Sequence, residues 1–159
     1  MAYDMHLRAL SEHATLALGA ALAKLNARGI IGLAGELGAG KTTLVRAWLR
    51  ALGWQGQVKS PTFTLIESYA LNGLTIHHID LYRLHDASEL ECLGFRDLLR
   101  GESLCLIEWP QRARDLITEV NIAIDLDYDG EFRQVHLHFT DEQLGKQFAN
   151  SIRDSDSKA

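Results

Sequence analysis

The chain has 159 residues, 47% of them apolar, and a net charge of −5, a balance typical of one folded domain around a single hydrophobic core. No apolar run approaches the roughly 18 residues that cross a bilayer, and the first residues have neither the basic start nor the apolar stretch of a secretory signal, so we expect a soluble, cytoplasmic protein with no membrane role. Lysines and arginines are scattered singly among acids, which argues against direct binding of DNA or RNA and leaves any nucleic acid to a partner.

The first third of the chain predicts a helix, a buried strand and a second helix. Ser11 is a good helix N-cap, and leucines at helical spacing follow it until Gly29. The apolar residues 30–34 predict a short, fully buried strand. A glycine-rich stretch then separates this strand from a helix that we expect from Lys41 to about Leu52.

The middle of the chain predicts a β-hairpin followed by a helical region. Asn-Gly at 72–73 is the strongest short hairpin signal, and it lies between the apolar segments 63–70 and 74–79. Residues 86–99 carry a helical pattern that Gly94 interrupts.

The last third predicts another buried strand and a second hairpin. Residues 104–107 are apolar and are followed by Glu108, and a short helix is expected around 111–117. The second hairpin pairs residues 121–128 with 131–139.

Strands that alternate with helices, together with two hairpins, predict an α/β sandwich with a mixed central sheet and helices on both faces. We expect one domain over residues 1–150. Asp141 is positioned to cap a terminal helix, whereas residues 151–159 are polar enough that we expect a disordered tail.

The cysteines and histidines give weak signals. Cys92 and Cys105 fit neither a CxxC motif nor a zinc ligand pair, which suits free thiols in a reducing compartment. His136 and His138 would share one face of a strand, which leaves open a metal pair beside the plainer interpretation as two strand residues.

A phosphate-binding loop is the strongest feature of the sequence. Residues 35–42, Gly-Glu-Leu-Gly-Ala-Gly-Lys-Thr, match the pattern G-x-x-x-x-G-K-[ST] at every fixed position, and the motif follows a predicted strand and opens a predicted helix. The fold is therefore expected to be of the P-loop NTPase type. The predicted ATP-binding residues of this loop are Gly35, Glu36, Leu37, Gly38, Ala39, Gly40, Lys41 and Thr42.

The chemistry explains each residue type in the motif. Glycines let backbone N–H groups approach the phosphates, and the new helix presents its unpaired N–H groups to the same anion. Lys41 is expected to reach the β- and γ-phosphates, while the Thr42 hydroxyl ligates Mg²⁺. The sequence leaves open whether Thr43 touches the α-phosphate or is a plain helix residue.

A P-loop enzyme also needs a carboxylate near Mg²⁺ and a group that positions the attacking water. Glu108 and Asp80 each end an apolar segment and are the candidates. We assign Glu108 to the metal shell and Asp80 to a metal-bound or attacking water, and the two roles are exchangeable at this stage. Thr62 follows Ser60-Pro61 and either offers its hydroxyl to Mg²⁺ and the γ-phosphate or closes its own turn. Trp109, next to Glu108, suits either the core or a partner contact.

Four motifs resemble one known family. They are GELGAGKTT at 35–43, SPTF at 60–63, HIDLYR at 78–83 and LIEWP at 106–110, in this order and spacing. Together they resemble the TsaE (YjeE) family, the bacterial ATPases needed to make threonylcarbamoyladenosine in tRNA. The resemblance spans about residues 5 to 140.

This resemblance implies a partner complex of TsaB and TsaD, of which TsaD performs the threonylcarbamoyl transfer, and it places tRNA indirectly through that complex; the sequence leaves open whether the chain also touches tRNA. It also implies that the segment from Ser11 to Thr15 lies near the nucleotide base and that Arg133 adds a nucleotide contact.

Two other classes share the loop. A small-molecule or nucleotide kinase would need an acceptor pocket and usually a basic lid, and no Arg-rich lid segment is present in the sequence. A GTPase switch would need the guanine-reading NKxD motif, which the sequence lacks.

Overall fold

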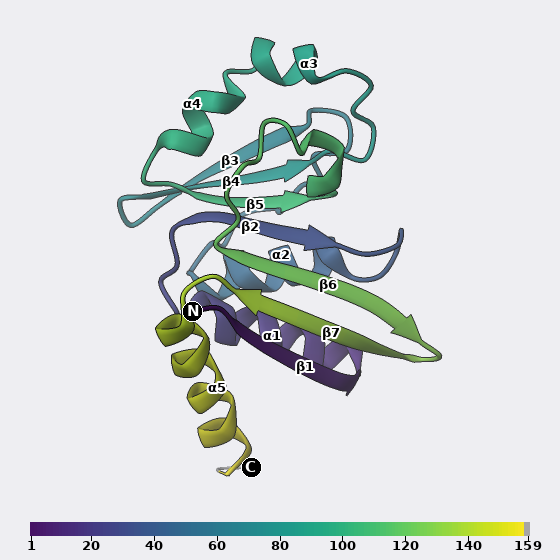
Figure 1. The fold of residues 1–159 in the computed structure, drawn as a ribbon, viewed down its shortest axis with the longest axis vertical. Helices are drawn as coiled ribbons and strands as arrows, with labels where there is room; N and C mark the ends of the chain where they lie inside the picture. Colours follow the sequence, from purple (N-terminus) through teal and green to yellow (C-terminus); the bar gives the residue numbers. More distant parts are fainter. Residues whose placement is uncertain (158–159) are drawn as a thin grey trace.

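The computed structural model describes residues 1–157, apart from the side chains of Ala9 and Asp156. Within this range the chain forms a seven-stranded sheet, α-helices and one 3-10 helix (Figure 1). In chain order the elements are β1 (Tyr3–Leu10), α1 (Glu12–Ala23), β2 (Gly29–Ala34), α2 (Lys41–Ala51), β3 (Ile66–Leu71), β4 (Leu74–Asp80), α3 (Ala87–Cys92), α4 (Phe95–Arg100), β5 (Leu104–Glu108), η1 (Pro110–Ala113), β6 (Ile122–Asp129), β7 (Phe132–Phe139) and α5 (Glu142–Asp156).

The sheet is mixed, as predicted. Its strand order is β1-β7-β6-β2-β5-β4-β3. The four central strands β6, β2, β5 and β4 run parallel, whereas β7 and β1 at one side and β3 at the other are antiparallel to their neighbours. Strands β2 and β5, at the centre of the sheet, are buried and have near-continuous apolar sequences, which is why their sequence signal was strong.

Helices cover both faces of the sheet, which confirms the predicted layers. On one face Leu22 of α1, Trp48 of α2 and Phe148 of α5 belong to the larger hydrophobic cluster. On the other face Leu90 of α3 and Phe95 of α4 belong to a smaller cluster. Figure 1 shows α3 and α4 at the β3–β4–β5 end of the sheet and α1 and α5 at the β1–β7 end.

Strand β1 is absent from the elements predicted above. Its residues alternate between apolar side chains that pack on the larger cluster, such as Tyr3 and Met5, and polar ones such as Asp4 and His6. It pairs antiparallel with β7 along the edge of the sheet. The period-2 pattern was present in the sequence but was missed.

Three predicted boundaries differ from the structure because residues that the patterns assigned to a helix or strand form turns instead. Helix α1 ends at Ala23, and the left-handed Asn26 then turns the chain before Gly29 begins β2. Residues 63–65 are not part of β3, because the Leu65 amide donates to the Pro61 carbonyl and closes a turn. The helix expected around 111–117 is the single 3-10 turn η1.

The expectation of a disordered tail from residue 151 is wrong for residues 151–156. Helix α5 continues to Asp156, and Ile152 packs against the larger cluster beyond Phe148. Leu144, Phe148 and Ile152 recur at every fourth position and place one apolar face of this polar helix on the larger cluster. Residues 158–159 lie outside the described part of the chain.

Two further sequence signals find ordinary places in the fold. His136 Nε2 and His138 Nδ1 lie 3.0 and 2.9 Å from Asp4 Oδ1 across the β1–β7 pair. Among the described residues, no group of three or more His, Cys, Asp or Glu side chains is arranged to hold a metal ion. Cys92 and Cys105 are both free thiols. No helix within residues 1–157 is long and apolar enough to span a membrane.

Candidate nucleotide-binding site

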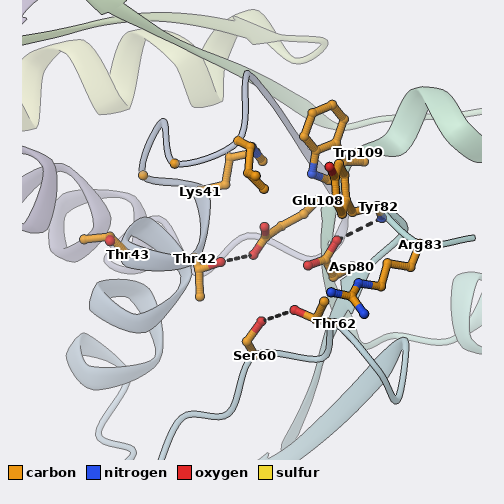
Figure 2. Close-up of a pocket in the computed structure, with 13 residues that line it drawn as sticks. Lys41, Thr42, Thr43, Ser60, Thr62, Asp80, Tyr82, Arg83, Glu108 and Trp109 are labelled. Carbon is orange, nitrogen blue, oxygen red and sulfur yellow. Dashed lines mark hydrogen bonds between the residues drawn. The ribbon is translucent and has the colours of Figure 1, made fainter.

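The site lies where the carboxyl ends of three neighbouring parallel strands meet. The loop after β2 leads into α2, and the last residues of β4 and β5, Asp80 and Glu108, are directly paired in the sheet register. Ligands of open α/β sheets bind at this edge. A pocket of about 350 Å³ opens here, lined by Leu37, Gly38, Gly40, Lys41, Thr42, Thr43, Ser60, Thr62, Asp80, Tyr82, Arg83, Glu108 and Trp109 (Figure 2).

The loop conformation depends on glycine at two positions. Gly35 has a φ of 140°, and a Cβ there would lie 2.3 Å from the Leu126 carbonyl oxygen. Gly40 has a φ of 107° and is the N-cap of α2, so this helix begins without a side-chain cap. The first N–H groups of α2 are therefore available to an anion in the pocket.

Lys41 lies folded against the loop. Its side-chain Nζ donates to the carbonyl oxygens of Gly35 and Glu36 at 2.7 and 2.9 Å and lies 4.5 Å from the centre of the Trp109 ring. Burial lowers the pKa of Lys41, whereas the charges of Glu108, Asp80 and Glu36 act in the opposite direction. The ammonium group thus lies at the pocket wall, and a bound phosphate can replace the two carbonyl oxygens as its hydrogen-bond acceptor.

Thr42 and Glu108 form a direct contact. The Thr42 hydroxyl donates to Glu108 Oε1 at 2.9 Å, as Figure 2 shows. Glu108 Oε1 also accepts from His78 Nε2 at 2.8 Å. Glu108 is 3% exposed, so this carboxylate is held by donors at the buried end of the pocket.

Asp80 lies beside Glu108 and is also buried. Its Oδ1 accepts from the Tyr82 amide at 3.0 Å. Burial raises the pKa of Asp80, and the neighbouring Glu108 charge raises it further, while the Tyr82 hydrogen bond, His78 and Lys41 oppose the shift. Two adjacent buried carboxylates and a threonine hydroxyl are oxygen donors of the kind that Mg²⁺ prefers, so the residues present fit this ion.

The loop that contains Thr62 is linked to Asp80 through the backbone. Ser60 Oγ and Thr62 Oγ1 are 2.7 Å apart, and both residues line the pocket. Thr62 therefore bonds within its own turn and also lines the pocket, and its contact with Mg²⁺ and the γ-phosphate stays a prediction. Leu65, left-handed with a φ of 63°, accepts from the Asp80 amide at 3.0 Å.

The segment expected near the base, Ser11 to Thr15, and the additional nucleotide contact Arg133 lie outside the pocket lining. Ser11 caps α1 by accepting from the Ala14 amide, and the Thr15 hydroxyl donates to the Ser11 carbonyl. Thr15 is 1% exposed, so its side chain is engaged in the helix end. Arg133 Nε donates to the Ala39 carbonyl of the loop at 2.9 Å. Arg133 and Leu10 are paired in the sheet, so β7 brings Arg133 close to the start of α1.

Tyr82 and Arg83 line the pocket and Tyr128 lies beside it, but the sequence did not single them out as site residues. Tyr82 and Arg83 lie in the HIDLYR motif, and the Arg83 guanidinium lies 4.4 Å from the centre of the Phe63 ring. Tyr128, on the β6–β7 hairpin, donates its hydroxyl to the Gly38 carbonyl. Tyr128 and Gly38 are 90 positions apart, and no local pattern in the sequence signals such a contact.

Comparison with known proteins places the chain in a family. The model of the family described as "Threonylcarbamoyl adenosine biosynthesis protein TsaE" matches residues 9–135. The chain belongs to the TsaE family. It is 45% identical over 120 residues to the tRNA threonylcarbamoyladenosine biosynthesis protein TsaE of Haemophilus influenzae, covering 76% of this chain and 75% of that protein. The TsaE protein of Bacillus subtilis is 35% identical over 116 residues, covering 70% and 72%.

The TsaE family match includes the whole pocket. Residues 9–135 contain the phosphate loop, Asp80, Glu108 and Arg133, whereas most of β1 and all of α5 lie outside it. The crystal structure of Bacillus subtilis YdiB has the same fold, with a TM-score of 0.76, 23% identity and coverage of 94% of this chain and 97% of that one.

Proposed function

We propose that this TsaE-family chain binds Mg-ATP in the pocket at the ends of β2, β4 and β5 and hydrolyses it. We further propose that hydrolysis serves the cycle of a TsaB–TsaD complex that makes threonylcarbamoyladenosine at tRNA position 37. The observation that supports the proposal is the contact between Thr42 and Glu108, which lies beside Asp80 and next to a complete phosphate loop.

Each residue then has one task. The glycine loop and the first turn of α2 bind the phosphates, and Lys41 leaves its carbonyl partners to contact the β- and γ-phosphates. Thr42 and Glu108 hold Mg²⁺, which neutralises charge on the phosphates when it is bound. Asp80 orients the attacking or a metal-bound water, and Thr62 offers its hydroxyl at the γ-phosphate. The Thr42–Glu108 bond supports this division of roles between the two acids.

The same pocket edge suits coupling to a partner. Residues 60–64 and 80–83 line or adjoin the site, and a backbone bond joins Leu65, directly after the first segment, to Asp80 at the start of the second. Phe63 is 83% exposed under Arg83, so a protein that contacts Phe63 would act on the segment that holds Asp80. We therefore expect weak ATPase activity from the chain alone and stimulation by TsaB and TsaD.

Phosphate release from Mg-ATP, measured with and without purified TsaB and TsaD, tests the proposal. We expect slow release that the two partners accelerate, with no label transferred from ATP to a metabolite. Transfer of the γ-phosphate to a small molecule would instead establish the kinase alternative. No release in either condition would contradict the ATPase assignment.

A further inference from the structure

A buried histidine lies beneath the candidate metal site. His78 is on β4, two residues before Asp80, and has no exposed surface. Because side chains alternate along a strand, His78 and Asp80 project from the same face of β4. The roles proposed above for the pocket do not use His78.

The bond that His78 makes is directed at one oxygen of Glu108. A carboxylate accepts hydrogen bonds, so His78 Nε2 is the donor to Glu108 Oε1 at 2.8 Å. The Thr42 hydroxyl donates to the same oxygen at 2.9 Å. Two donors, one from β4 and one from α2, thus fix the Glu108 carboxylate. Both bonds go to Oε1, which leaves Oε2 for the pocket that Glu108 lines.

If His78 only filled space in the core, its second ring nitrogen would make it an unfavourable residue at this position. Nδ1 of His78 is buried and has no hydrogen-bond partner within the described chain. An unpaired buried polar atom lowers stability, and an aliphatic side chain at this position would avoid that loss. The hydrogen bond to Glu108 offsets this loss of stability.

We propose that His78 is a positioning residue that orients Glu108 so that its second oxygen faces the Mg²⁺ of the bound nucleotide. The inference rests on the Mg-ATP function proposed above and deepens it. His78 touches neither the nucleotide nor the metal and acts through Glu108. Hydrogen-bond partners of metal ligands, when removed, typically reduce metal affinity or activity about 10–100-fold.

Substitutions at His78 that keep or lose the donor test this role. The side-chain amide nitrogen of His78→Gln reaches about as far as Nε2, whereas that of His78→Asn reaches only as far as Nδ1 and cannot contact Glu108. Binding of the non-hydrolysable β,γ-imido analogue of ATP is measured by calorimetry over a series of MgCl₂ concentrations and in EDTA. We expect His78→Asn to need about 10–100-fold more Mg²⁺ for half-maximal binding. Its binding in EDTA should match the parent chain, and His78→Gln should stay close to the parent in both conditions.

A double-mutant cycle separates positioning from packing. In a Glu108→Gln background, His78→Asn should not raise the Mg²⁺ requirement further, because its effect runs through the Glu108 carboxylate. Thermal melting without Mg²⁺ checks that each variant is folded, and His78→Leu replaces His78→Asn if the asparagine variant does not fold.

The outcomes distinguish this inference from the proposed function. A parent chain without Mg²⁺-dependent binding of the analogue overturns both. A parent with such binding, together with a parent-like Mg²⁺ requirement in His78→Asn, overturns the positioning role alone. Equal losses in His78→Gln and His78→Asn, or additive losses in the cycle, assign His78 to packing and also overturn it.

Discussion

At the residue scale, three buried charges share the pocket. Lys41, Asp80 and Glu108 are 4%, 6% and 3% exposed, and charged side chains are rarely so buried unless they are paired or bind a ligand. This burial lowers the pKa of Lys41 and raises the pKa of Asp80, since it disfavours the charged form of each group. A bound Mg-nucleotide would supply both the anion and the cation that these groups favour.

Replacing Lys41 tests the phosphate contact. We expect Lys41→Ala to lose a charge-assisted hydrogen bond worth about 1.5–3 kcal/mol, which weakens ATP binding roughly ten- to a hundredfold. Calorimetry with Mg-ATP measures the loss, and Lys146→Ala on the exposed side of α5 is the matched control. Unchanged ATP affinity in Lys41→Ala would falsify the role of the loop lysine.

Replacing Asp80 separates stability from turnover. The pKa of Asp80 is higher in the folded chain than in the unfolded chain, so at a pH between these two pKa values the folded chain binds more protons. The free energy of unfolding without Mg²⁺ therefore falls as the pH rises through this range. A neutral isostere removes this penalty. We therefore expect Asp80→Asn to be more stable than the parent at pH 7 in EDTA, and its partner-stimulated hydrolysis to fall at least about tenfold. Urea unfolding and phosphate release measure the two effects, and a variant that is both less stable and fully active would contradict the assignment.

The sequence identified residues whose signal is local and missed those whose partner is distant. The glycines, Lys41 and Thr42 form one contiguous motif, and Asp80 and Glu108 each end an apolar strand. His78 and Tyr128 act through contacts with residues 30 and 90 positions away. Only the pairing of strands brings such residues together, and a single sequence does not reveal it.

At the element scale, the loop before α2 is held by the neighbouring hairpin as well as by its own glycines. Tyr128 and Arg133, from β6 and β7, donate to the carbonyls of Gly38 and Ala39. The backbone of β6 also leaves no room for a side chain at Gly35, because the Leu126 carbonyl is so close. The hairpin therefore shapes the phosphate loop although it lies far along the chain.

Two glycine substitutions compare the effect of a left-handed backbone alone, at Gly73, with the added effect of the close Leu126 carbonyl, at Gly35. Gly73 has a φ of 79° in the β3–β4 turn, and a Cβ there meets nothing within 4 Å. We expect Gly73→Ala to lower the free energy of unfolding by about 1–2 kcal/mol from its left-handed backbone alone. Gly35→Ala should lower it further and abolish ATP binding, since the Leu126 carbonyl must move. Urea unfolding with ATP calorimetry checks both, and equal effects of the two variants would show that the β6 contact does not shape the loop.

The elements that could be predicted were those with strong and local patterns. The buried strands, the Asn-Gly hairpin and the capped helices were found because their signals lie within a few residues. Strand β1 was missed because its period-2 pattern is a weaker signal than a continuous apolar run, and α5 extends beyond its predicted end because Ile152 packs against the larger cluster beyond Phe148. Such weak amphipathic elements depend on the sheet to which they pack.

At the scale of the whole molecule, α5 completes the larger core. Phe148 is fully buried, and its ring centroid lies 5.6 Å from that of Phe139 on β7. We expect Phe148→Ala to lower the free energy of unfolding by about 3–5 kcal/mol, because it leaves a cavity between the helix and the sheet. Urea unfolding measures the change, with Lys146→Ala on the same helix as control. A loss no greater than that of the control would mean that the C-terminal helix is not part of the folded core.

Our central proposal is that the phosphate-loop pocket of this TsaE-family chain binds ATP and serves tRNA modification. Its most direct test is mass spectrometry of tRNA nucleosides from the host after depletion of the protein and re-expression of variants. We expect threonylcarbamoyladenosine to fall on depletion, to return with the parent chain or Lys146→Ala, and to stay low with Lys41→Ala. Normal modification after complete depletion, or full recovery with Lys41→Ala, would contradict the account.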